Sequence, residues 1–168
     1  MSEAPTSKTN NLEAEVQPVC DSIQYISDAR MVFGSFNRED VEVSTEMELN
    51  ISSEARGFVN PENRRQFAVR VHLTLTLTNS KTNPVVLIEG SYIIQYETKD
   101  LQVTETQANQ YAQYNGIFNA WPFWREYVQT CCARMGIPPL PVPVYRQGMA
   151  GATTHLQAED AAKEALNS

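Results

Sequence analysis

Few side chains in this sequence are of a type and spacing that could do chemistry. The two histidines are His72, within a stretch of alternating apolar and polar residues, and His155, near the C-terminal end. The sequence contains no H-E-x-x-H metal motif, no G-x-S-x-G nucleophile motif and no glycine-rich phosphate loop. Glu42, Glu46 and Glu48 recur on one face of an expected strand, where a solvated surface explains them better than a metal ion does. We therefore expect no catalytic residues, no metal and no cofactor, and hence no enzyme.

The three cysteines form neither a zinc motif nor a redox motif. Cys131 and Cys132 are adjacent and Cys20 is solitary, with no C-x-x-C spacing. We interpret all three as reduced packing residues, because a free cysteine behaves as a small hydrophobic side chain. The polar start of the chain lacks the apolar segment of a secretory signal, and no run approaches the roughly 20 apolar residues of a membrane span. A cytoplasmic location without membrane insertion is therefore expected.

Length and charge set further limits. A chain of 168 residues fits one domain, which we expect over residues 16–146. Residues 1–15 are expected to be disordered, and residues 147–168 to form a flexible acidic tail. The net charge of -7 and the pI near 4.8 argue against a nucleic-acid partner, because phosphate binding requires clustered Lys and Arg.

The elements that must position any site begin with strands. Residues 41–52 and 67–78 alternate apolar and polar positions with a period of two, which predicts strands with one apolar and one wet face. Residues 85–96 predict a strand that is apolar on both faces, so it lies deep in a sheet or meets a partner. Residues 22–35 predict an earlier strand with a weaker pattern.

The apolar period then becomes helical. A capping-box pattern at Thr104 predicts a helix over 104–115, which Gly116 is expected to interrupt, and a second helix is expected over 121–135. Strands followed by helices predict the α+β class: a four-stranded antiparallel sheet with two C-terminal helices packed on one face.

The second helix and the residues after it are the most informative segment. Residues 121–128 read Trp-Pro-Phe-Trp-Arg-Glu-Tyr-Val, which places four aromatic rings near the helix start. Pro122 fits the first turn, where its missing N–H is not needed, and Gly136 fits a left-handed stop. So much aromatic surface suggests a protein that holds other apolar chains. Burial in the core is the alternative for each ring.

These features together resemble the SecB family of bacterial protein-export chaperones. The resemblance covers roughly residues 17–145 and rests on the strand pattern, Trp-Pro-Phe-Trp-Arg-Glu at 121–126 and Gly-Ile-Pro-Pro-Leu at 136–140, in this order. The segment 104–116 looks closer to the divergent SecB-like chaperones of toxin–antitoxin systems than to the export chaperone itself. The resemblance implies a homotetramer, assembled as a dimer of dimers, that binds unfolded polypeptides in apolar grooves without ATP.

The resemblance also implies two sets of site residues. Those carried over to a client-binding groove are Val86, Ile88, Tyr92, Trp121, Phe123 and Trp124. Those carried over to a docking surface for the SecA motor are Asp28, Leu87 and Glu89. Arg30 has the wrong sign for that surface, which weakens the SecA inference, because charge complementarity sets partner choice and association rate.

The expected function is an ATP-independent holdase for unfolded polypeptides, serving either protein export with SecA as partner or an antitoxin client. Two alternatives stay open from the sequence. One is a carrier for a small apolar ligand, since an α+β sheet backed by an aromatic helix can enclose a cavity. The other is a structural adaptor in which the strand over 85–96 serves one fixed partner.

Overall fold

The computed structural model describes residues 16–40, 42–44, 47–79 and 84–145. The disorder expected for residues 1–15 and the tail expected over 147–168 lie outside these residues. None of the helices within the described ranges has the length and apolar character that a membrane crossing requires.

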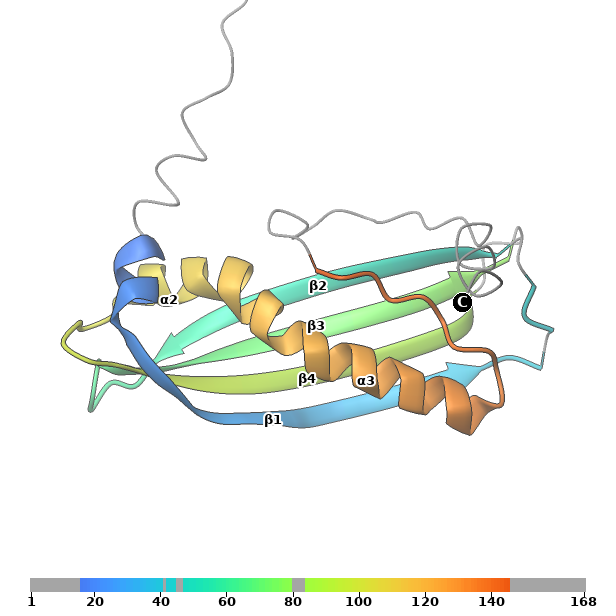
Figure 1. Ribbon diagram of the computed structural model, residues 1–168, viewed down its shortest axis with the longest axis horizontal. Coiled ribbons are helices and arrows are strands. Elements are labelled where there is room, and N and C mark those ends of the chain that lie inside the picture. The colour runs from blue at the N-terminus through green and yellow to red at the C-terminus, as the bar shows by residue number, and fades with distance from the viewer. Residues whose placement is uncertain (1–15, 41, 45–46, 80–83, 146–168) are drawn as a thin grey trace, which may run out of the picture.

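The four strands form one antiparallel sheet (Figure 1). They are β1 (Ile23–Arg38), β2 (Glu48–Val59), β3 (Gln66–Thr78) and β4 (Pro84–Thr98), in the order β1-β4-β3-β2. In β3 and β4 the side chains on one face are buried and those on the other are partly exposed. The alternation of residues 67–78 predicts this for β3, and the prediction that residues 85–96 lie deep in a sheet agrees with the inner position of β4. The predicted α+β class is therefore confirmed, with β4 at the centre of the sheet beside β3 and β1 at one edge.

One strand was predicted in the wrong place. Residues 42–44 have no regular structure, and β2 starts at Glu48 and continues to Val59, beyond the predicted end at residue 52. The buried positions of its second half are Ala55 and Gly57, which are too small to stand out as apolar in the sequence.

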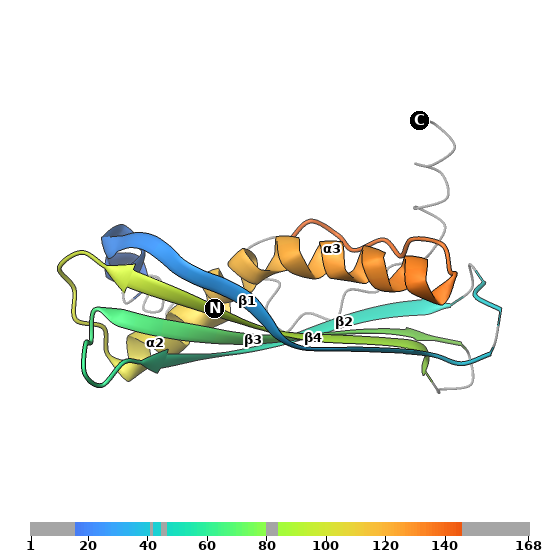
Figure 2. The same ribbon diagram turned by 90° about the horizontal axis from the view of Figure 1, so that it is seen from below.

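A short helical segment covers residues 16–22 before β1. The helices that follow the sheet form a continuous run on one of its faces (Figures 1 and 2). It consists of α2 (Glu105–Tyr111), a π-helical turn η1 (Ala112–Gly116) and α3 (Ile117–Met135). The predicted capping box starts α2, and Gly136 ends α3 with a φ of 65°, as predicted. The run shows that the expected interruption at Gly116 was wrong and that Pro122 lies inside α3, not in its first turn.

Gly116 is needed for close packing rather than for a break. A Cβ atom at this position would lie 2.5 Å from Cγ1 of Val69, so only glycine lets the π turn rest directly on β3. The wider π turn carries the chain from α2, which packs on β2, to α3, which crosses toward β1 (Figure 1).

Trp124 is the largest fully buried side chain beneath α3. Its ring lies over Gly90 of β4, where a Cβ atom would be only 3.0 and 3.2 Å from two ring carbons. The absence of a side chain at Gly90 therefore lets α3 pack closely against the sheet.

The segment after α3 runs back along that helix (Figure 1). Trp121 Nε1 donates to the carbonyl of Pro143 at 2.7 Å, and Gln129 Nε2 donates to the carbonyl of Leu140 at 3.2 Å. The Trp121 and Tyr145 rings lie 5.2 Å apart. This segment therefore covers one side of α3 and leaves the side that faces β1 uncovered.

Gly57 supplies the first prediction. A Cβ atom there would lie 2.2 Å from the backbone of Ala108 in α2, which cannot move as a flexible side chain does. Gly57→Ala should lower the free energy of unfolding by about 1–3 kcal/mol, because overpacking forces backbone shifts. Ser52→Ala, at an exposed position of the same strand, should change it by less than about 0.5 kcal/mol in urea unfolding. Equal effects would contradict the close approach of α2.

A cluster of three rings joins α2 to the sheet. Phe67 stacks on Tyr96 at 5.0 Å, and Tyr111 meets both rings edge-on at 5.3 and 5.0 Å. Burial raises the pKa of Tyr96 to about 12 and also raises that of Tyr111, although Asn119 donates a hydrogen bond to the Tyr96 hydroxyl at 2.9 Å.

This cluster predicts alkaline sensitivity. The folded pKa is raised above the unfolded value of about 10, so the contribution is fully present below pH 10 and is lost as the pH rises toward 12. The free energy of unfolding should therefore fall across this window in urea titrations at successive pH values. Tyr111→Phe removes one buried hydroxyl and should make the fall shallower; an unchanged slope would disprove the assignment.

Candidate functional site

The outer edge of β1 carries an unusual amount of exposed apolar surface. Its only hydrogen-bonded neighbour among the described strands is β4, and three register shifts interrupt that pairing. The large apolar side chains of β1 that are 38–48% exposed are Tyr25, Ile26, Met31, Val32, Phe33 and Phe36. By the register, Ile26, Met31 and Phe36 lie on the face that α3 covers, and Tyr25 and Phe33 lie on the opposite face. Isolated exposed apolar residues are ordinary, but an edge strand that exposes apolar side chains on both faces marks an interaction surface.

A small open cavity lies between this strand and α3. It has a volume of about 150 Å3 and is lined from three elements: Ala29, Arg30 and Met31 of β1, Tyr92 and Ile94 of β4, and Phe123 and Glu126 of α3. We call it the β1–α3 pocket. Met31 and Tyr92 are paired across the strands, which places both side chains on the face that α3 covers.

The pocket combines an exposed ring with a buried hydroxyl. Phe123 is 50% exposed at its α3 wall, whereas Tyr92 is only 3% exposed. The Tyr92 hydroxyl has no hydrogen-bond partner among the described residues. Burial, followed by the nearby Tyr127 and Glu126, raises the pKa of Tyr92, so the hydroxyl stays protonated and can donate. The pocket can therefore take an apolar group, and it lies beside a buried hydroxyl that has no partner among the described residues.

Contacts from β1 hold α3 beside the pocket. Arg38 Nη1, at the end of β1, donates to the carbonyl of Met135 in the last turn of α3 at 2.7 Å. Tyr127 packs over Gly34 of β1, and its ring lies 6.0 Å from that of Trp124.

Most of the residues expected to line a groove are buried instead. Val86, Ile88 and Trp124 are 0% exposed and Trp121 is 6% exposed, so these four belong to the core and are not open to a client in this chain. The physical reason is that the even-numbered face of β4 lies directly beneath the helical run. Of the six, only Tyr92 and Phe123 line the pocket.

The sequence did carry a signal for the β1 surface that was missed. Met31, Val32 and Phe33 are consecutive apolar residues where strict alternation would place a polar one. A register shift falls between Met31 and Phe33, so the break in the pattern corresponds to a bulge that exposes all three.

The residues expected for SecA docking lie on the opposite face of the sheet, but not together. Leu87 and Glu89 are close neighbours on β4, whereas Asp28 pairs with Gln95. Glu89 and Gln95 are six residues apart along one strand, which corresponds to about 20 Å. Asp28 also forms an ion pair with Arg30. The three residues therefore do not form one acidic patch.

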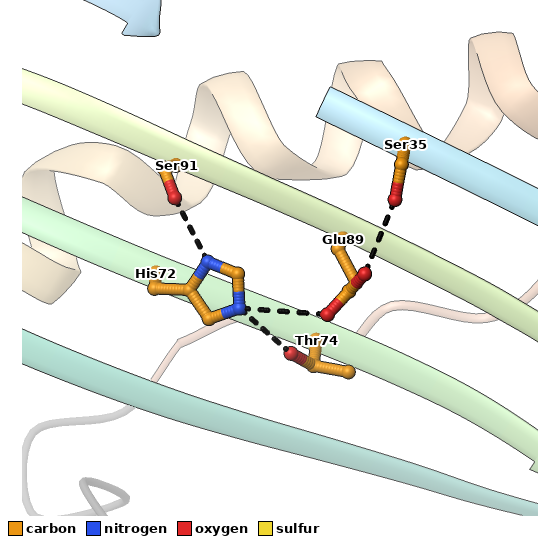
Figure 3. A network of polar contacts seen from close by, with 5 residues as sticks. All are labelled: Ser35, His72, Thr74, Glu89 and Ser91. Atoms are coloured by element: carbon orange, nitrogen blue, oxygen red, sulfur yellow. Dashed lines mark hydrogen bonds and ion pairs between the residues drawn. The ribbon is translucent and has the colours of Figure 1, made fainter. Parts of the chain in front are cut away.

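A polar network surrounds Glu89 (Figure 3). Ser35 donates to Glu89 at 3.1 Å, and Nε2 of His72 lies 3.7 Å from the same carboxylate. On its other side His72 Nδ1 is 2.8 Å from Ser91 Oγ, and Thr74 lies 3.3 Å from Nε2.

Ser91, His72 and Glu89 are the residue types of a hydrolase catalytic triad, but the site around them cannot support that reaction. All three side chains stand on inner strands, whose backbone N–H groups are engaged in the sheet ladders and cannot form an oxyanion hole. We assign the network a role in fixing side chains on the sheet surface. Within the described part of the chain no group of three or more His, Cys, Asp or Glu side chains could hold a metal ion.

Comparison with known proteins now identifies the architecture. No family model matches this sequence, and no curated protein matches it. A solved structure does match: a SecB-like chaperone from Mycobacterium tuberculosis, in complex with a ChAD peptide from the HigA1 antitoxin. The TM-score is 0.71 at 20% sequence identity, over 82% of this chain and 99% of that one. The chain has the SecB-like fold.

The SecB-like fold confirms the resemblance that was read from the aromatic segment and the Gly-Ile-Pro-Pro-Leu tail. At this sequence identity the match concerns the architecture, and the antitoxin peptide belongs to the mycobacterial protein.

Trp124 and Phe123 are sequence neighbours with opposite environments, which gives a matched test. Trp124→Ala should lower the free energy of unfolding by about 3–5 kcal/mol, because it opens a cavity in the core over Gly90. Phe123→Ala should cost less than about 1 kcal/mol, because half of that side chain is already exposed to water. Chemical denaturation measures both, and a small cost at Trp124 would show that it is not a core residue.

Proposed function

We propose that this protein is a chaperone that holds unfolded polypeptide segments, without ATP, on the surface formed by the exposed side of β1 and the β1–α3 pocket. The observation that carries the proposal is the exposed apolar row on an edge strand next to an open pocket. The SecB-like fold supports it, since a protein of that architecture binds a peptide.

The proposed binding mode follows from the chemistry of the pocket. An extended client segment presents alternate side chains to one side, so an apolar one can enter beside Phe123 and Met31. Burying several hundred Å2 of apolar surface contributes several kcal/mol at roughly 25 cal/mol per Å2, before ordering costs. Such contacts are non-directional and therefore suit clients of different sequence.

The self-association implied by the resemblance belongs to the same proposal. The exposed row on β1 runs well beyond the pocket, from Tyr25 to Phe36. A second copy would cover the part of this row outside the pocket, in the homotetramer that the SecB resemblance implies. The pocket would then continue into the longer groove that an extended client needs.

An antitoxin-type client is favoured over an export precursor. The mycobacterial protein of this fold was solved with an antitoxin peptide. On this chain the residues that would dock SecA are dispersed, and Asp28 is paired with Arg30. Export with SecA remains the alternative.

The other two sequence-based hypotheses lose support. A carrier for a small apolar molecule needs a pocket of about 300–1,000 Å3, and the β1–α3 pocket has about 150 Å3. An adaptor that offers the strand over 85–96 to a partner needs a free strand edge, and β4 is paired on both sides, by β1 and by β3.

Phe123 and Phe58 give a matched test of the client surface, because both are 50% exposed and lie on opposite faces of the sheet. Phe123→Asp places a charge in the pocket and should raise the protein concentration needed to delay refolding of a slow-folding reporter by at least about tenfold, without ATP. Phe58→Asp should leave it unchanged. Both variants should unfold at nearly the wild-type denaturant concentration.

Two results would count against this function. The first is that excess wild-type protein fails to delay refolding. The second is that Phe58→Asp weakens the delay as much as Phe123→Asp, which would show that exposed apolar surface of any location is responsible.

A further inference from the structure

The sheet face opposite the helices carries a row of arginines. The strand pairing places Arg30 of β1 opposite Ile93 of β4, Ile93 opposite Arg70 of β3, and Arg70 opposite Arg56 of β2. Residues in register share a face, so the three guanidinium groups project from one line across the sheet, and all three residues are exposed. We call this line the arginine row.

Two arginines of the row have no direct ionic partner among the described residues. Arg56 and Arg70 form no side-chain hydrogen bond and no ion pair within the described residues, and like charges directly opposite each other destabilise a sheet. Arg30 forms an ion pair with Asp28. Two unpaired, facing arginines are unexpected in a chain of net charge -7, where carboxylates are abundant.

Two of the carboxylates on the same face are engaged elsewhere, whereas Glu54, two residues before Arg56 on β2, is exposed and forms no hydrogen bond or ion pair within the described residues. Glu97 accepts hydrogen bonds from Tyr25 at 2.8 Å and Gln66 at 3.1 Å, and these contacts hold its pKa below the ordinary value. Glu89 is held by Ser35 and His72 on the other side of the row. The arginine row therefore lies between these two occupied acidic positions, with the carboxylate of Glu54 beside its β2 end.

The dimensions of the row define what could bind it. At about 4.8 Å between strands, Arg56 and Arg70 are adjacent and Arg30 lies two spacings further, so the row spans about 14 Å. An extended peptide of about five residues covers this length, and carboxylates are the natural partners of guanidinium groups. Exposed rings stand on the neighbouring rows, Phe33 at one edge of the sheet and Phe58 at the other.

We propose that the arginine row is a docking site for a short acidic segment of a partner protein. The site lies on the sheet face away from α3 and meets the proposed client surface only at β1, where Arg30 also lines the pocket; it goes beyond the holding function. The row is positively charged, whereas the docking surface expected from the sequence is acidic, so the two would select partners of opposite charge. A partner with a basic docking segment would meet Arg30 and Arg70 between Asp28 and Glu89 and would be repelled at the centre.

Fluorescence anisotropy with the full chain and two labelled peptides of equal length tests the proposal. One peptide alternates glutamate with serine and the other alternates lysine with serine, so neither has an apolar side chain for the client surface. The glutamate peptide should bind the more tightly, and its affinity should fall with added salt because the contacts are exposed. Arg56→Glu combined with Arg70→Glu should weaken its binding by at least about tenfold.

The matched control is Lys99→Glu combined with Arg125→Glu. It changes the net charge equally, and both residues are exposed and lie outside the row, Arg125 on α3. This variant should bind the glutamate peptide almost as well as the wild type. Both double variants should still delay refolding of the reporter, which separates this proposal from the holding function.

Four outcomes would overturn the proposal. The first is that the lysine peptide binds as well as the glutamate peptide. The second is that the control variant loses as much affinity as the arginine variant. The third is that a single-stranded oligonucleotide binds through the arginines more tightly than the glutamate peptide does, which would assign the row to nucleic acid. The fourth is that the arginine variant dissociates into smaller species in analytical sedimentation while the wild type remains associated, which would assign the row to contacts between copies of this chain.

Discussion

The structure depends on how closely α3 approaches the sheet through Trp124. The indole can pack this closely against β4 only because Gly90 has no side chain, and Gly116 lets the preceding turn rest on Val69 in the same way. A helix seated so low buries one face of β3 and β4 completely. Because one helical run cannot also reach past the edge of the sheet, β1 keeps most of its apolar side chains in water. The packed core and the exposed edge are thus two results of one contact.

The sequence determined local structure better than it determined which surfaces stay open. Strict alternation located β3 to within a residue, and the capping box and the left-handed Gly136 located the helix ends. Whether Val86 and Trp124 face a client or the chain's own helix was not predictable, because both surroundings select the same apolar side chains. The glycine at 116 was misread for a related reason, since a break and a close approach both require glycine.

The β1 surface shows how a weak pattern can carry more functional information than a strong one. A strand that is covered on one face alternates cleanly, as β3 does. A strand with bulges and consecutive apolar residues, as β1 has at Met31 to Phe33, cannot bury them all within its own sheet. Its sequence is consistent with cover that comes from outside the chain, either a second copy or a client.

The two surfaces of the molecule differ in the kind of specificity that they can provide. The pocket beside Phe123 offers apolar contact, which depends on area and accepts many sequences. The arginine row offers charge at fixed spacings, which rejects partners of the wrong sign. The sheet separates them everywhere except at β1, where Arg30 belongs to the row and also lines the pocket. Because Arg30 belongs to both surfaces, we expect β1 to be the element through which holding a client and docking a partner influence each other.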